Sequence, residues 1–179
     1  FKKCTDFGLI TMAAGGGGDY CEERIEKFDK QILHRCFAIQ QKLLLNTPML
    51  ILGMGRWHEY PLEPVVEYLK KYQDRGIRAS IMANLNARLL RDGPPERIVG
   101  AVKRFIKVLG KAHNLAIVLA NIPADTPPRH IHTAVAATRA CGRLAPGADP
   151  DEIEVTVPER ESLQEYIAAM SGGRGLPVS

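Results

Sequence analysis

The chain has 179 residues, of which 45% are hydrophobic and 25% are charged, a composition that excludes an intrinsically disordered protein. The net charge of +4 is spread along the chain and aromatic residues make up only 6%, so we expect no groove of basic and base-stacking side chains and no nucleic-acid partner. No apolar stretch approaches the roughly 20 residues that a membrane-spanning helix needs, and no secretion leader follows Phe1. These features predict a soluble, cytoplasmic protein without a membrane partner.

The first 48 residues contain one strongly amphipathic segment. Residues 9–12 have the character of a short strand, and the run of alanine and glycine at 13–18 is typical of a hinge rather than of a phosphate-binding loop. Asp19 and Glu22 then form a capping box that predicts the start of a long helix. The apolar stripe of this helix steps by three or four residues along Ile25, Phe28, Ile32, Cys36, Ile39 and Leu43.

Three runs of residues with strand character follow along the chain, at 49–54, 77–82 and 115–120. The first is a continuous apolar run, which is typical of a strand that is covered on both faces in a parallel sheet.

Each of these runs is followed by a helical pattern that opens at proline and ends at glycine. The predicted helices extend from Pro61 to Gly76, from Pro94 to Gly110, and from Pro127 to Gly142, the last with Thr126 as its N-cap. Strands that alternate with single helices imply a parallel sheet, because parallel neighbours need a long return connection. The fold class is therefore α/β, while the periodicity leaves open whether the sheet is open or closed.

After Pro146 the composition becomes acidic. We expect residues 147–179 to form an extension of the domain at 1–146, with an edge strand at 153–157, a short helix around Leu163 to Met170, and a flexible tail. The four cysteines show no CxxC spacing, which in a chain without an export signal predicts free thiols.

Two motifs resemble those of the uroporphyrinogen decarboxylase family, which includes the cobalamin-dependent methyltransferases. Ala83-Asn84-Leu85-Asn86, with the helix opening at 92–98, is similar to the Gly-Asn-Leu-Asp-Pro loop of the family. Asn121-Ile-Pro-Ala-Asp-Thr-Pro-Pro, with the helical stretch that follows at 131–142, resembles its closing Asp-Thr-Pro-Pro turn and last helix. The resemblance covers residues 77–143 and implies a parallel (β/α) barrel of the TIM type. Since such a barrel takes about 250 residues, we expect the C-terminal half or another partial barrel.

The resemblance also implies a function. It favours a methyltransferase component that moves a methyl group between a small methylated donor and a corrinoid, the cobalamin cofactor being held on a partner protein. The alternatives are decarboxylation of a tetrapyrrole acid and a non-catalytic split-barrel subunit. A partial barrel would associate with its missing half or form a homo-oligomer.

The sequence departs from the family at the residues that hold zinc in the thiol-methylating members. Leu52-Gly53-Met54-Gly55 stands where a His-x-Cys-Gly motif would be sought, and Ala120-Asn121 replaces the cysteine after the last strand. These departures favour the relatives that act on methyl ethers or methylamines.

Active sites of (β/α) barrels form on the loops at the carboxyl ends of the strands. The first such loop contains Arg56, His58 and Glu59. His58, with Glu59 beside it, is our candidate proton donor, because imidazole titrates near neutrality, or a metal ligand, because imidazole and carboxylate both coordinate zinc. Arg56 is a candidate for substrate binding. The alternative for this loop is a surface turn around a half-buried Trp57.

Candidate binding residues also follow the second and third strands. Asn84 and Asn86 could hydrogen-bond a substrate or stabilise their own loop, and Arg88 could bind an anion or remain solvated. In the third loop, Asn121, Asp125 and Thr126 are candidates for substrate or cofactor binding, although Thr126 is first expected to cap a helix.

Overall fold

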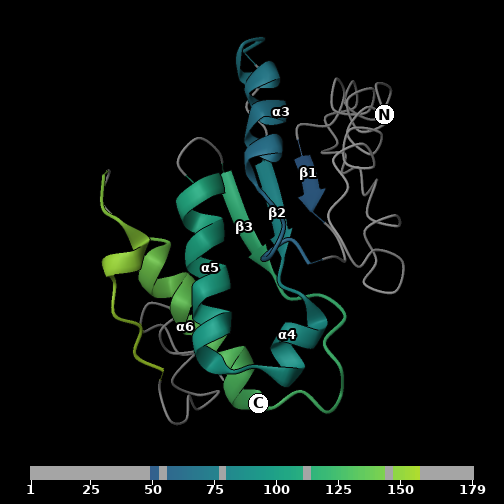
Figure 1. Cartoon of the computed structure of the whole chain (residues 1–179), viewed down its shortest axis with the longest axis vertical. Coiled ribbons are helices and arrows are strands. Elements are labelled where there is room, and N and C mark those ends of the chain that lie inside the picture. The colour runs from purple at the N-terminus through teal and green to yellow at the C-terminus, as the bar shows by residue number, and fades with distance from the viewer. Residues whose placement is uncertain (1–48, 53–55, 77–79, 111–113, 144–146, 158–179) are drawn as a thin grey trace, which may run out of the picture.

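The computed structural model describes residues 49–52, 56–76, 80–110, 114–143 and 147–157 (Figure 1). Strands β1 (Met49–Leu52), β2 (Ser80–Asn84) and β3 (Asn114–Val118) form one sheet in the order β1-β2-β3. Both pairings are parallel, and Ser80 aligns with Met49 on one side and with Asn114 on the other. The predicted parallel sheet is therefore present in this part of the chain.

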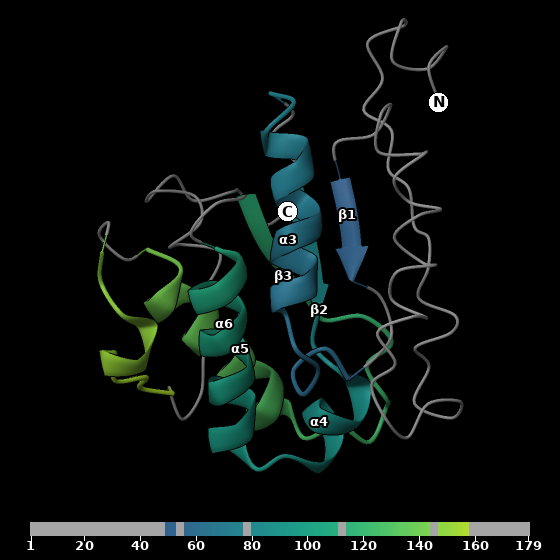
Figure 2. The same ribbon diagram turned by 45° about the horizontal axis from the view of Figure 1, so that its top comes forward.

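Helices connect the strands as the sequence predicts. Helix α3 (Glu63–Gln73) lies between β1 and β2, α5 (Pro95–Leu109) lies between β2 and β3, and α6 (Pro128–Cys141) follows β3. A short additional helix, α4 (Ala87–Asp92), directly follows β2 and was not predicted separately. Figures 1 and 2 show α3 and α5 over the same face of the sheet. None of the described helices combines the length and the apolar character needed to cross a bilayer.

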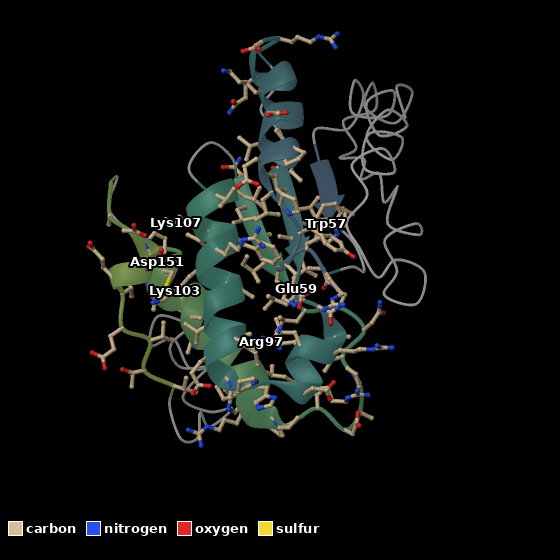
Figure 3. The ribbon with its side chains drawn as sticks, in the orientation of Figure 1. Trp57, Glu59, Arg97, Lys103, Lys107 and Asp151 are labelled. Carbon is tan, nitrogen blue, oxygen red and sulfur yellow. The ribbon has the colours of Figure 1, made fainter. Side chains whose placement is uncertain are left out.

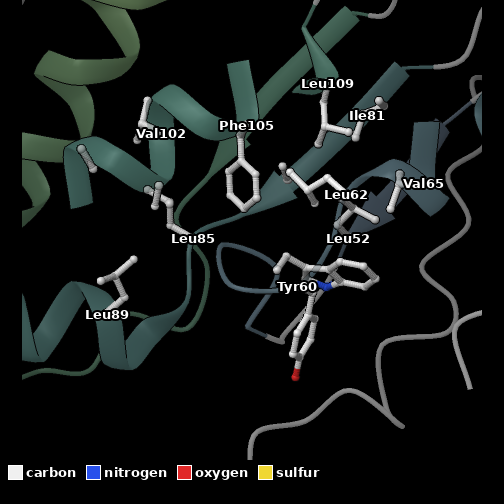
Figure 4. Close-up of a cluster of buried hydrophobic side chains, with 14 of the residues drawn as sticks. Leu52, Tyr60, Leu62, Val65, Ile81, Leu85, Leu89, Val102, Phe105 and Leu109 are labelled. Atoms are coloured by element: carbon white, nitrogen blue, oxygen red, sulfur yellow. The ribbon is translucent and has the colours of Figure 1, made fainter. Parts of the chain in front are cut away.

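The core lies between this helical layer and the sheet (Figure 4). The apolar α5 side chains that step by three or four residues are fully or almost fully buried, and Ile106 beside them is partly buried. Burial of so many apolar side chains fixes α5 over the sheet. The buried apolar residues of the sheet and of the two helices are Leu52, Ile81, Ala83, Val65, Leu69, Ile98, Ala101, Val102, Phe105 and Leu109.

The predicted cap of α6 is wrong by one residue. Pro127 is the N-cap, and no side chain caps this helix end. Thr126 precedes the cap position, so its hydroxyl is not placed to accept from the first turn. Instead Thr126 is buried, and its Oγ1 atom has no hydrogen-bond partner among the described residues.

The predicted edge strand at 153–157 is also wrong. After the short 3-10 helix η2 (Pro150–Glu152), these residues join no sheet. Lys103 of α5 instead donates to the carbonyl oxygens of Asp151 and Ile153, and Lys107 pairs with Asp149 and Asp151 (Figure 3). The segment is therefore held on α5 rather than at a strand. The expected strand at 9–12, the run at 13–18, the helix after Asp19, the short helix near Leu163 and the tail lie outside the described residues.

Candidate functional site

The loops after β2 and β3 lie at one edge of the sheet and are joined by hydrogen bonds. Asn84 Oδ1 accepts from the Ala120 amide at 2.9 Å, and the Leu85 amide donates to the Val118 carbonyl at 2.9 Å. Helix α4 lies beyond the tips of the strands at this edge (Figure 1). This arrangement follows from the parallel sheet, because all its strands end on the same side.

A pocket of about 230 Å³ opens between the loop after β1, helix α4 and the start of α5. It brings together five of the nine predicted site residues, from two of the three candidate loops. Asn84, Asn121, Asp125 and Thr126 do not line it. The lining residues are Arg56, His58, Glu59, Asn86, Arg88, Leu89, Asp92, Gly93 and Arg97.

The Glu59 carboxylate is the centre of the charged part of this pocket. Arg56 Nη2 lies 2.5 Å from Oε2, Arg97 Nη2 lies 3.1 Å from Oε1, and His58 Nε2 lies 3.4 Å from Oε1. Figure 3 shows Glu59 and Arg97 facing each other between the loop and α5. One carboxylate thus connects the candidate imidazole with two guanidinium groups.

His58 is the most enclosed ionisable group of the pocket. Its side chain is 8% exposed, and its buried Nδ1 atom has no hydrogen-bond partner in the described part of the chain. Burial lowers the pKa of His58 below its ordinary value of 6.5, and Arg97, Arg56 and Arg104 lower it further, while Glu59 acts in the opposite direction. The lowered pKa favours the neutral imidazole, and the fraction that carries a transferable extra proton grows as the pH falls.

Arg104 of α5 holds the loop that carries His58. Its guanidinium donates to the carbonyl oxygens of His58 at 2.5 Å and Tyr60 at 2.6 Å, with a longer contact of 3.4 Å to that of Trp57. Trp57 and Tyr60 are themselves buried, with their rings in an edge-to-face contact. The predicted surface turn with a half-buried Trp57 is therefore a tightly anchored loop.

The sequence analysis missed Arg97 and Arg104. Both contact residues that lie 38 to 47 positions earlier in the chain, which no local pattern reveals. Their spacing offered one signal, because residues seven apart in a helix lie on nearly the same face. Two arginines at this spacing, on the flank of an otherwise apolar helix face, indicate that polar groups of a neighbouring element lie within their reach.

The asparagines after β2 stabilise the loop, as one of the two predicted alternatives proposed. Asn86 is the N-cap of α4, and its Oδ1 accepts from the amides of Arg88 at 2.9 Å and Leu89 at 3.1 Å. Through this cap Asn86 sets the position at which Arg88 lines the pocket. Asn84 has a comparable role between β2 and the loop after β3.

Gly93 forms the turn at the far side of the pocket, and we expect it to tolerate no side chain. Its φ of +54° and ψ of −152° belong to a region that only glycine adopts readily. An added Cβ would also lie 2.6 Å from Cε1 of His130, whose Nδ1 is anchored 2.8 Å from the Leu90 carbonyl. Gly93→Ala should lower the free energy of unfolding by about 2 kcal/mol or more. Urea denaturation of the intact protein measures this change.

Gly100→Ala is the matched control for that substitution. Gly100 lies in the middle of α5, and an added Cβ there meets no atom within 4 Å. Alanine should therefore raise the free energy of unfolding by about 0.5–1 kcal/mol. Equal effects at the two glycines would contradict the described turn.

The described residues contain no group of three histidine, cysteine, aspartate or glutamate side chains placed to hold a metal ion. Of the four cysteines, Cys141 lies in the described part of α6 and is a free, buried thiol. Comparison of the chain with protein-family models, with curated protein sequences and with solved structures found no match.

Proposed function

We propose that the pocket is an active site in which His58 and Glu59 exchange a proton with a small organic substrate. One observation carries this proposal: a nine-tenths buried imidazole, whose Nδ1 atom has no hydrogen-bond partner among the described residues, lines an open pocket at the carboxyl edge of a parallel sheet. A buried polar atom without a partner is costly unless a ligand or another group satisfies it. Glu59, at 3.4 Å from the other ring nitrogen, orients the ring and favours its protonated form.

The chain would supply this site to a (β/α) barrel. Three parallel strands in sequential order, with α3 and α5 over one face, support part of such a barrel. Within the described residues, β1 and β3 each pair on one side only. Association with the rest of a barrel, or with a second copy, would extend the sheet at these edges.

The reaction we propose is methyl transfer from a small methylated donor to a corrinoid, as the resemblance of the 83–98 and 121–142 motifs implies. The oxygen of an ether and the nitrogen of an amine are poor leaving groups unless they receive a proton. His58 would provide that proton, and Glu59 would stabilise the imidazolium. Arg56 and Arg88 would hold the part of the donor that does not react.

A corrinoid does not fit the described pocket. Its volume of about 230 Å³ is below the roughly 300–1,000 Å³ typical of ligand sites, and seven of its nine lining residues are charged or polar. A large macrocycle would need a wider and more apolar surface. The residues present suit the methyl donor alone, so a partner protein would have to present the cofactor at the mouth of the pocket.

Decarboxylation of a tetrapyrrole acid is the second candidate. The observation that favours it is the presence of Arg56, Arg88 and Arg97 around one pocket, because arginine pairs well with carboxylates.

An assay of both reactions tests these functions. The intact protein would be supplied with a panel of methyl ethers and methylamines together with a corrinoid protein, and separately with uroporphyrinogen. Methyl transfer that requires the protein supports the first candidate. Release of carbon dioxide without methyl transfer would replace it with the second, and neither reaction would remove both.

A further inference from the structure

The pocket carries more positive than negative charge. Its lining contains the three arginines Arg56, Arg88 and Arg97, against the carboxylates of Glu59 and Asp92. Asp92 is already paired with Arg91, which does not line the pocket and donates to the two carboxylate oxygens at 2.7 Å and 3.0 Å. Of the three lining guanidinium groups, those of Arg56 and Arg97 contact the Glu59 carboxylate.

A ligand could replace the Glu59 carboxylate as the ion-pair partner of Arg56 and Arg97. Arg97 and Arg56 each contact it through a single Nη2 atom, whereas a guanidinium offers five N–H donors in a fixed fork. The two guanidinium side chains are 60% and 41% exposed, so solvent and solutes can reach them. Ion pairs with this exposure are weak, and their exchange for another anion costs little.

We propose that the pocket binds an oxyanion, a carboxylate or phosphate group of the substrate, which takes the place of the Glu59 carboxylate on Arg97. In the structure, the Glu59 carboxylate occupies the position on Arg97 that this oxyanion would take. This inference rests on the proposed function, since it names the substrate class of the same pocket. It adds that the substrate is anionic and that its charged group and Glu59 compete for one guanidinium.

Displacement of Glu59 would change the surroundings of His58. The charged groups that act on this imidazole are Glu59 and Arg56 of its own loop and Arg97 and Arg104 of α5. Arg88 and Asp92 of α4 line the same pocket. If Glu59 leaves Arg97 but keeps its 3.4 Å contact with His58 Nε2, an oxyanion on Arg97 adds a negative charge near the imidazole and offsets one of the positive charges that disfavour protonation. Binding of the substrate then prepares the proton donor.

Calorimetric titration of the intact protein with inorganic phosphate and with benzoate tests the proposal. Chloride would keep the ionic strength constant, because exposed charges are screened by salt. The variant Arg97→Gln removes the proposed ligand-binding group and should weaken binding about tenfold. Glu59→Gln removes the competing carboxylate and should tighten binding about threefold. The matched control is Arg143→Gln, an exposed arginine after α6 that does not line the pocket and should leave affinity unchanged.

The affinities of the three glutamine variants for the two anions decide the outcome. Stronger binding of phosphate identifies a phosphorylated ligand, and stronger binding of benzoate identifies a carboxylate. Weaker binding by Glu59→Gln, or equal losses in Arg97→Gln and Arg143→Gln, would overturn the proposal. If anion binding depends on Arg97 but the protein has neither enzymatic activity, the proposed function is rejected and the anion site is kept. If the protein turns over substrate but Arg97→Gln leaves anion binding unchanged, the anion site is rejected and the proposed function is kept.

Discussion

His58→Asn is expected to lower the rate of methyl transfer by about 100- to 10,000-fold, the usual contribution of a general acid or base. Asparagine keeps a polar side chain in the enclosed position but cannot transfer a proton near neutral pH. Substrate affinity should change much less, because the arginines of the pocket remain in place. Rates of the proposed methyl transfer and affinities for the methyl donor would be measured separately with the intact protein and a corrinoid protein.

His132→Asn is the control for that prediction. His132 belongs to α6, does not line the pocket and should therefore support normal turnover as asparagine. Turnover of His58→Asn within a few-fold of the unmodified protein would remove His58 from the chemical step. Glu59 would then have to be tested as the proton-transferring group.

Arg104→Ala is expected to lower the free energy of unfolding by about 3 kcal/mol. The guanidinium is the hydrogen-bond donor to the carbonyls of Trp57, His58 and Tyr60, and its loss leaves acceptors in a partly buried loop without that donor. Arg104→Lys should recover part of the loss, because one ammonium keeps the charge but cannot match the guanidinium fork. Urea denaturation of the two variants gives both values.

The same substitution should also affect the site. Arg104 positions the loop of His58 without lining the pocket, so Arg104→Ala should reduce turnover and change its pH profile, because one of the charges acting on the His58 pKa is lost. Arg143→Ala should change stability by no more than about 0.5 kcal/mol, as expected for a surface residue. Arg104 is not an anchor if its alanine variant is as stable as this control.

The alternation of strands and helices was predictable because it rests on strong local patterns. The runs at 49–54 and 115–120 correspond to β1 and β3, and prolines precede or open the helices that follow. Helix α4 escaped prediction because its six residues contain only Leu89 and Leu90 as buried positions, too few to define a periodic face.

The segment at 153–157 shows where a correct pattern leads to a wrong element. Ile153, Val155 and Val157 are partly buried while Glu154 and Thr156 are exposed, so the predicted alternation is real. An extended chain becomes a strand only if it meets a sheet edge, and this one meets the lysines of α5 instead. The sequence contains the alternation but not the position of the segment relative to the sheet.

The candidate site was predicted only in part, because the sequence does not show how distant segments pack. Residues in loops after parallel strands were expected to meet, and Arg56, His58, Glu59, Asn86 and Arg88 do. Arg97 joins them in the pocket and Arg104 anchors the loop of His58, both across long sequence separations that are fixed by the packing of α5 on the sheet. Tertiary packing, not local pattern, completes the charge constellation.

Titration of the His58 imidazole by NMR in the intact protein tests the central claim most directly. An enclosed ring beside the arginines should titrate below 6.5, and saturating phosphate or benzoate should raise its pKa by offsetting the charge of Arg97. His132 serves as the internal reference. A His58 pKa at or above 6.5 that no anion moves would contradict both the enclosed imidazole and the charged pocket around it.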